Sequence, residues 1–262
     1  MTVDIYQVDA FSSHLFKGNP AAVCLLNEWL PDETLKSIAA ENNLSETAYV
    51  IARDDHFELR WFTPTVEVSL CGHATVATAL VLFDELKYEN SIIRFQTKSG
   101  ELTVRKDNNF YLLNFPANDP TEVTDYPNEL IEALHCKPVK VLKGKTDYMV
   151  VVETQREVEL LQPNHTLLRG IKVRGVIVTA VGDEVDFVSR FFAPGSGVDE
   201  DPVTGSAHTM LIPYWAKKLG KEAFYAKQLS ARGGTLKCKL LGDRVEIGGA
   251  AKLYMKGQLF LP

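Results

Sequence analysis

The sequence has few cysteines, no excess of basic residues and no long apolar run. Its 262 residues include four cysteines, which show neither paired metal spacing nor the density of a disulfide-rich secreted domain. Lysine and arginine number 28 against 34 acidic residues, giving a net charge of −6, which argues against nucleic acid or an anionic membrane as a partner. No apolar run approaches the ~20 residues that cross a bilayer, and the first residues alternate like a strand, unlike a signal peptide. We therefore expect free thiols, a cytoplasmic location and a small-molecule ligand.

Cofactor and metal motifs are also lacking. Residues 144–146 resemble the end of a phosphate-binding loop, but Val139 stands where that loop requires a glycine. Residues 195–197 lack the third glycine of a dinucleotide-binding turn, and acidic residues follow. The six histidines show no spacing typical of a zinc enzyme. We expect neither a cofactor nor a catalytic metal.

What the sequence does contain is an approximate internal repeat. Gly72 and Gly205 each stand in a turn of small residues that leads into an apolar stretch, and they are 133 residues apart. Residues 60–64 recur as 190–194, and residues 99–104 recur as 233–238, with offsets of 130 and 134. Three matches in the same order indicate two similar lobes.

The pattern of elements predicts an α+β fold, with one apolar helix in each lobe, instead of alternating βαβ units. The proline-rich residues 116–120 mark a linker, so we expect an N-terminal lobe of residues 1–119 and a C-terminal lobe of residues 120–262. Each lobe should be a mostly antiparallel sheet or barrel around its central helix. Strands are expected at 3–10, 21–26, 57–62, 92–96, 101–105, 110–115, 139–142, 148–152, 173–180, 185–192, 235–240, 244–247 and 250–255, and further helices at 31–42, 128–134 and 157–161.

The two glycine turns are candidate sites for a small carboxylate. Backbone N–H groups in the first turn of a helix are unpaired and carry partial positive charge. If the lobes close on each other, the turns at Gly72 and Gly205 would converge on one anion; the alternative is that both glycines only permit tight turns. His73 could donate to an oxyanion or relay a proton, or its ring could be satisfied inside the turn.

Three more side chains near these turns have more than one interpretation. Asp201 could assist a general base or cap the second helix. It does not form a hydrolase triad with Ser206 and His208, because residues two apart on a helix point to different faces. Glu46 lies where a helix exit meets an apolar strand and could reach a cleft, although a solvated carboxylate is the alternative.

Three motifs, at residues 44–48, 70–75 and 200–208, resemble those of the PhzF-like isomerase family. The agreement includes residues 8–11, 18–21 and 232–234, so it covers nearly the whole chain. The family shares the diaminopimelate epimerase fold of two lobes that each wrap a central helix, and its members are commonly homodimers. The resemblance implies a cofactor-independent isomerase. In it, Glu46 would be the catalytic acid/base, His73, Asp201 and Ser206 would line the site, and Gly72 and Gly205 would bind the substrate carboxylate.

The resemblance also distinguishes between two mechanisms. Epimerases of this fold use one cysteine from each lobe; Cys71 occupies the first position, but Thr204 occupies the second, and its hydroxyl is too weak an acid to replace a thiol. A single carboxyl group such as Glu46 could instead remove a proton and return it on the same face of a substrate. Two alternatives stay open: a racemase or epimerase that uses Cys71 with Asp201 or Glu46, and a non-catalytic carboxylate-binding protein.

Overall fold

The structure, a computed structural model, describes residues 1–261 and consists of two compact units. Unit 1 comprises Met1–Phe115 and Ile247–Pro262, and unit 2 comprises Pro116–Glu246. The first change of unit falls at the start of the expected linker. The expected second lobe, residues 120–262, differs from unit 2 because the C-terminal strand pairs along its whole length with the N-terminal strand, from Thr2↔Phe260 to Ala10↔Ala251.

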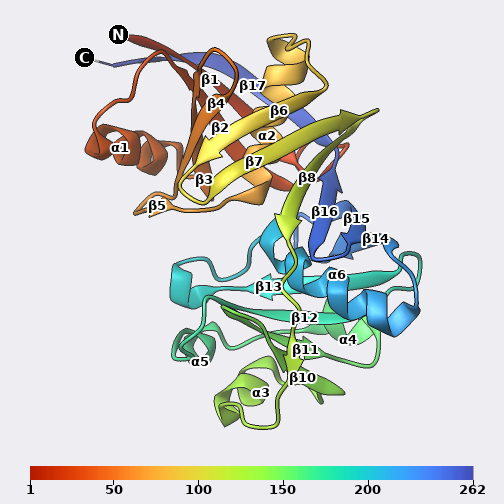
Figure 1. Cartoon of the computed structure of the whole chain (residues 1–262). Coiled ribbons are helices and arrows are strands. Elements are labelled where there is room, and N and C mark those ends of the chain that lie inside the picture. The colour runs from red at the N-terminus through yellow and green to blue at the C-terminus, as the bar shows by residue number, and fades with distance from the viewer. Residues whose placement is uncertain (262) are drawn as a thin grey trace. The chain divides into compact units, whose positions relative to one another are not determined.

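Unit 1 is a mixed sheet in which the strand order is β17-β1-β2-β3-β4-β6-β7-β8 (Figure 1). A short strand, β5, pairs with β4. The elements are β1 (Thr2–Ala10), β2 (Asn19–Leu26), α1 (Asp32–Asn42), β3 (Glu46–Ala52), β4 (Phe57–Phe62), β5 (Glu67–Val68), α2 (Gly72–Leu80) with a π-helical turn (Val81–Glu85), β6 (Ile92–Thr97), β7 (Gly100–Asp107), β8 (Phe110–Pro116) and β17 (Ala251–Phe260).

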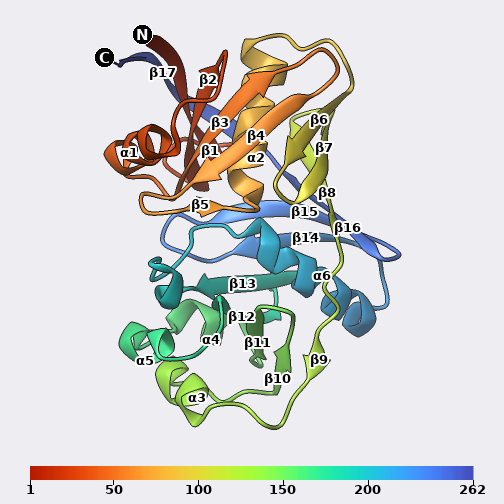
Figure 2. The same ribbon diagram turned by 60° about the vertical axis from the view of Figure 1, so that its left-hand side comes forward.

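Unit 2 repeats this arrangement, with the strand order β9-β10-β11-β12-β13-β14-β15 (Figure 2). The chain returns to unit 1 within strand β16. The elements are β9 (Thr121–Glu122), α3 (Asn128–Leu134), β10 (Lys140–Lys143), β11 (Asp147–Val151), α4 (Gln155–Leu160), α5 (His165–Arg169), β12 (Gly175–Val181), β13 (Phe187–Phe192), a 3-10 turn (Pro194–Ser196), α6 (Gly205–Leu219), β14 (Ala223–Gln228), β15 (Gly234–Leu241) and β16 (Arg244–Gly249).

The strand pairings confirm the internal repeat and give its register. In unit 1, β2 and β3 are parallel neighbours, and β3 pairs antiparallel with β4; in unit 2, β11, β12 and β13 are related in the same way. Because Ala21 pairs with Glu46 and Asp147 pairs with Gly175, the position of Glu46 in the first repeat corresponds to Gly175 in the second. The first repeat thus carries a carboxylate where the second has no side chain.

Most pairings are antiparallel, as expected of an α+β fold, but four neighbouring pairs are parallel. The pairs β2/β3, β4/β6, β11/β12 and β13/β14 are parallel. Parallel neighbours need a crossover connection, and a helix lies in each one: α1, α2, α4 with α5, and α6. The central helices are therefore crossover connections as well as core elements.

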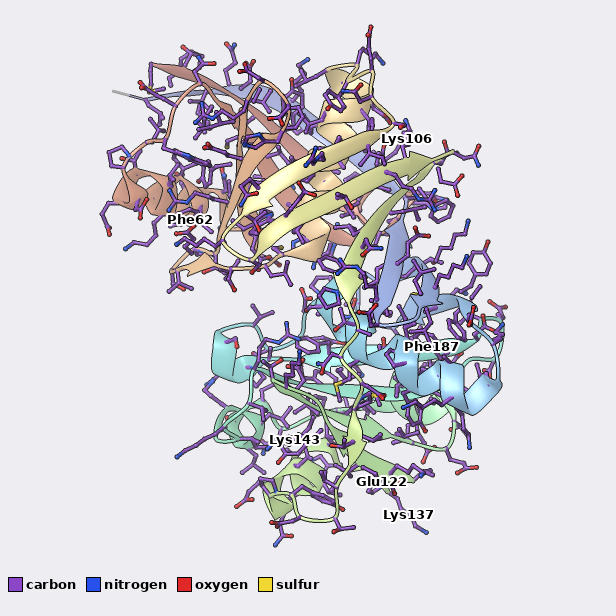
Figure 3. The ribbon with its side chains drawn as sticks, in the orientation of Figure 1. Phe62, Lys106, Glu122, Lys137, Lys143 and Phe187 are labelled. Atoms are coloured by element: carbon purple, nitrogen blue, oxygen red, sulfur yellow. The ribbon has the colours of Figure 1, made fainter. Side chains whose placement is uncertain are left out.

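Helix α2 is buried on every side. All nine of its residues are buried, and it packs against β1, β2, β3 and β17. A helix that is apolar all round belongs in a core. Unit 1 also buries the predicted face of α1, formed by Leu35, Ile38 and Ala39. It buries the ring of Phe62, labelled in Figure 3, which meets Tyr49 edge-on at 5.6 Å.

Helix α6 is longer and contains a proline. Pro213 has no N–H to donate to the carbonyl of Thr209, and that carbonyl accepts a hydrogen bond from the Asn118 N–H at 3.0 Å instead. The helix packs its Trp215 ring parallel to Phe187 of β13, with centroids 5.7 Å apart. Phe187 is labelled in Figure 3. Within residues 1–261, no helix has the length and apolar character required to cross a bilayer.

Candidate active site

The first turn of α2 brings three of the predicted side chains together in unit 1. Cys71 is the N-cap residue in an extended conformation, and the helix begins at Gly72. His73 follows in the first turn, and its Nε2 atom lies 3.2 Å from Oε2 of Glu46, the first residue of β3. On the other edge of the ring, Nδ1 lies 3.2 Å from Nδ2 of Asn19 and 3.5 Å from Sγ of Cys71. The imidazole therefore lies between a carboxylate on one side and an amide and a thiol on the other.

This cluster is buried but not saturated with hydrogen bonds. The His73 side chain is 6% exposed and that of Glu46 is 18% exposed. Although His73 Nε2 and Glu46 Oε2 are close, they are not aligned as a hydrogen bond, and both atoms are buried without one. Buried polar atoms in native proteins nearly always have a partner, so this pair of atoms is suited to receive a polar group of a ligand.

Burial and nearby charge shift the pKa of His73 in opposite directions. Burial lowers its pKa, but Cys71 and Glu46 raise it by more, so the pKa stands well above its ordinary value. Burial, followed by the Glu46 charge, raises the pKa of the Cys71 thiol. A neutral thiol contributes no charge, so we assign the raised pKa of His73 to the Glu46 carboxylate.

The same three side chains also form a possible metal-ligand set, which the sequence spacing did not reveal. Ligand atoms of Glu46, Cys71 and His73 lie within 4.8 Å of one another, and thiolate, imidazole and carboxylate are all zinc ligands. The thiol and the carboxylate approach opposite nitrogens of the ring. Because one ion binds only one of these nitrogens, a three-ligand site would require a side chain to move.

The first turn of α6 holds the corresponding residues of unit 2. Thr204 is the N-cap residue, and Gly205 begins the helix. The Thr204 hydroxyl donates to the Asp201 carboxylate, and its N–H donates to Oε1 of Gln228 at 2.8 Å. Gln228 Nε2 donates to the Asp201 carbonyl at 2.7 Å. The alternative that Asp201 is the N-cap of the helix was wrong, because the N-cap residue is Thr204.

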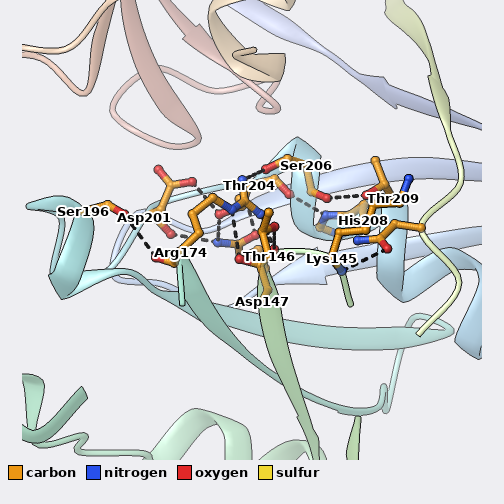
Figure 4. Close-up of polar contacts among 12 residues, drawn as sticks. Lys145, Thr146, Asp147, Arg174, Ser196, Asp201, Thr204, Ser206, His208 and Thr209 are labelled. Carbon is orange, nitrogen blue, oxygen red and sulfur yellow. Dashed lines mark hydrogen bonds and ion pairs between the residues drawn. The ribbon is translucent and has the colours of Figure 1, made fainter. Parts of the chain in front are cut away.

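Ser206, the second residue of α6, contacts an arginine that the sequence did not single out. Arg174 Nη1 donates to Ser206 Oγ at 2.6 Å, and the guanidinium forms a two-pronged ion pair with Asp147 (Figure 4). The Asp147 side chain is 2% exposed, whereas that of Arg174 is 37% exposed. Unit 2 thus presents a hydroxyl supported by a cation.

His208 is a core residue. It is fully buried, its Nδ1 is 2.8 Å from the Thr204 carbonyl, and its ring packs near Phe187. Burial lowers its pKa to about 4. Its position supports the exclusion of a hydrolase triad, because the ring bonds to backbone and the Ser206 hydroxyl bonds to Arg174.

The structure therefore groups the predicted residues by unit: Glu46, Gly72 and His73 with Cys71, and Asp201, Gly205 and Ser206 with Thr204. Sequence reasoning missed four side chains that hold them: Asn19, Asp147, Arg174 and Gln228. Asn19 stood in a recognised turn motif, and the others show no local pattern. The register of the repeat was the one signal that could have drawn attention to residues 174–175, beside the counterpart of Glu46.

The comparisons with known proteins concern the chain as a whole. Residues 8–257 match the family model of the phenazine biosynthesis-like proteins, PhzC-PhzF. An uncharacterized isomerase of Pseudomonas aeruginosa is 53% identical over 261 residues, and the match covers 100% of both chains.

Solved structures show the same relationship. A PhzF-family phenazine biosynthesis protein of Enterococcus faecalis superimposes with a TM-score of 0.96, at 45% identity and with 100% of both chains covered. A hydroxyproline epimerase from Agrobacterium vitis shares the fold at a TM-score of 0.63 and 10% identity, with 98% of this chain and 92% of that chain covered. The fold is thus the α+β fold of the epimerases, and the chain belongs to the phenazine biosynthesis-like (PhzF) family.

Proposed function

We propose that the protein is a cofactor-independent isomerase that moves a proton within a small carboxylate-bearing substrate. The observation that carries the proposal is the Glu46–His73 pair, whose facing atoms are 3.2 Å apart and buried without a hydrogen bond. Close relatives are named isomerases, which supports the reaction class.

Each residue of the two first turns has a role in this proposal. Glu46 removes a proton from one carbon and returns it to another, and His73 bears positive charge that stabilises the developing anion. Asp201 accepts a hydrogen bond from the Thr204 hydroxyl and so holds the first turn of α6. The proposed carboxylate-binding groups are the N–H group at Gly72 in unit 1, and the N–H group at Gly205 with the Ser206 hydroxyl in unit 2.

The thiol mechanism has less support. Burial raises the pKa of Cys71, which disfavours the thiolate that proton abstraction requires, and the counterpart of Cys71 in the second repeat is Thr204. Cys71 instead packs against His73 Nδ1. We also propose that the protein forms a homodimer. This part of the proposal rests on the family resemblance alone, and the molar mass from light scattering tests it.

Deuterium uptake into a panel of small carboxylates tests the proposal. The protein is incubated in D2O with compounds whose C–H bonds are acidified by a neighbouring C=O or C=C group, and NMR follows the loss of each C–H signal. We expect uptake into at least one compound, and a rate about 10²–10⁴-fold lower in the Glu46→Gln variant. Glu101→Gln, at an exposed ion pair of the same unit, is the matched control and should keep the native rate.

Two results would reject the assignment. Uptake that survives Glu46→Gln but is lost in Cys71→Ser would indicate a thiol-dependent racemase or epimerase. Tight carboxylate binding with no uptake into any compound would indicate a binding protein without catalysis.

A further inference from the structure

We propose that Arg174 is a positioning residue that makes the Ser206 hydroxyl selective for a carboxylate over a neutral group. This inference rests on the proposed role of Ser206 as a carboxylate ligand and adds the residue on which that role depends. It is carried by the contacts of the Asp147–Arg174–Ser206 chain (Figure 4).

The first step is the direction of the Ser206 hydrogen bond. A guanidinium only donates, so in the 2.6 Å contact with Arg174 Nη1 the Ser206 Oγ atom is the acceptor. The Ser206 O–H is then available to donate, and no acceptor for it is present among residues 1–261. A hydroxyl that accepts from a cation is a stronger donor, and its natural partner is an anion.

The second step is the rigidity of Arg174. Its Nε and Nη2 donate to the two oxygens of Asp147, its N–H donates to the Thr146 carbonyl at 2.9 Å, and its carbonyl accepts from the Ser196 hydroxyl at 3.1 Å. The guanidinium also lies 5.2 Å from the centre of the Phe191 ring. Both the backbone and the side chain of Arg174 are therefore fixed.

The third step is the glycine that follows. A Cβ atom on Gly175 would lie 2.3 Å from Cζ of Phe191, so the Phe191 ring occupies the space of the missing side chain. This is the position that corresponds to Glu46 in the first repeat. The second repeat thus lacks the carboxylate and places an aromatic ring under a guanidinium there.

The fourth step separates function from folding. In the first repeat, the positions that correspond to Asp147 and Arg174 are Ala21 and Ser45. The same parallel strand pair forms there without an ion pair. The fold therefore does not require the pair, and what the pair does in unit 2 is support Ser206.

The outer face of the guanidinium completes the recognition group. Arg174 uses three of its five N–H groups on Asp147 and Ser206, and its side chain is 37% exposed. One oxygen of a carboxylate can accept from the Ser206 O–H, and the guanidinium charge beside that hydroxyl favours the anion. A carboxamide oxygen can accept the same hydrogen bond but carries no net charge, so it gains less from the cation.

The test compares benzoate with the isosteric neutral probe benzamide. Native protein labelled with ¹⁵N is titrated with each at constant ionic strength, and the Kd is taken from the Gly205 amide resonance. Arg174→Gln alone would leave the buried Asp147 carboxylate without its cation, so the main variant is Arg174→Gln with Asp147→Asn. We expect at least a tenfold rise in the Kd of benzoate and less than a twofold change for benzamide.

Further variants distinguish positioning from general folding. Ser206→Ala should raise the Kd of benzoate to a similar extent, and combining it with the charge-removing pair should add little, because Arg174 acts through Ser206. Arg174→Lys should restore part of the selectivity. Arg169→Gln removes the same charge at the exposed Arg169–Asp199 pair of the same unit and should leave both Kd values unchanged.

The inference is overturned if the benzoate-to-benzamide ratio is the same in the native protein and the double variant, or if benzoate leaves the native Gly205 amide unmoved. Its failure is separable from that of the proposed function. The selectivity is read from the Kd ratio in the Arg174→Gln with Asp147→Asn variant, and the proposed function is read from deuterium uptake in Glu46→Gln, so each measurement tests one claim.

Discussion

The first turns of α2 and α6 share a hydrogen bond to the N-cap carbonyl, but the pKa values of their histidines are shifted in opposite directions. In each, the side chain three residues beyond the first helical glycine bonds to the N-cap carbonyl: the Thr75 hydroxyl donates to Cys71 at 2.5 Å, and His208 Nδ1 lies 2.8 Å from the Thr204 oxygen. Each turn contains a buried histidine. The pKa of His73 is raised, whereas that of His208 is lowered to about 4.

The difference shows how a duplicated fold can divide one task. His73 has a carboxylate beside it and so holds a proton, while His208 bonds to a backbone carbonyl and lies beside the Phe187 ring, and its burial keeps it neutral. The charged group of the second repeat is Arg174, a permanent cation that donates to Ser206. In our proposal, unit 1 therefore carries the groups that exchange protons, and unit 2 carries a cation and a hydroxyl that help to bind an anion.

The largest expected effect is the acid sensitivity that His208 gives to unit 2. Its ordinary pKa is 6.5 and its folded pKa is about 4, so its neutral form contributes stability that is complete above pH 6.5 and is lost as the pH falls toward 4. The slope is about 1.4 kcal/mol per pH unit, which gives a loss of about 3 kcal/mol in the free energy of unfolding. Urea denaturation between pH 7 and pH 4 measures it.

The control for His208 keeps the hydrogen bond and removes the titration. His208→Gln can still donate to the Thr204 carbonyl, and we expect it to abolish most of the extra slope, although its amide lowers stability at every pH. An unchanged slope in His208→Gln would contradict the assignment.

The next effect concerns the charge on His73. Its raised pKa depends on Glu46, so in Glu46→Gln burial should dominate and the pKa of His73 should fall below 6.5. NMR titration of ¹³C-labelled imidazole measures this directly. The native protein should also lose the stability contributed by charged His73 as the pH rises through the raised pKa, and the variant should not.

A Cys71→Ser variant is the matched comparison for His73. If the neutral thiol adds no charge, as its raised pKa indicates, Cys71→Ser should leave the pKa of His73 above its ordinary value. A fall of the His73 pKa to its value in Glu46→Gln would show that the Cys71 thiolate, not the Glu46 carboxylate, keeps His73 protonated.

The sequence predicted the fold and much of the site because both left patterns along the chain. The repeat, the two glycine turns and the buried face of α1 follow from spacing and periodicity. The return of β17 to unit 1 could not be predicted, because strand pairing between the two ends of the chain leaves no local pattern in the sequence. Arg174 was missed for the same reason: its partners Asp147 and Ser206 come from other elements, and only tertiary contact makes it more than a loop arginine.

The smallest expected effect compares Arg60 with its repeat counterpart Arg190. Each forms a two-pronged pair with a glutamate, Glu67 and Glu200 respectively. Loss of Arg60 leaves Glu67 with Lys98, whereas Glu200 has no second cation in the described part of the chain. We therefore expect Arg190→Gln to lower the free energy of unfolding by about 1–2 kcal/mol more than Arg60→Gln.

The two backbone carbonyls held by Arg190 add to this difference. Its Nη1 donates to the oxygens of Val158 and Leu161, at 3.3 Å and 2.8 Å, so the substitution frees two carbonyls of α4 and its end as well as a glutamate. Arg60 donates to side chains alone, including the exposed Asp32. Urea denaturation of both variants at pH 7 measures the difference, with Arg94→Gln, at the exposed pair with Glu101, expected within about 0.5 kcal/mol of native. Equal losses at Arg60 and Arg190 would show that the ring contacts, which the two arginines share, and not the carbonyls, determine their contribution.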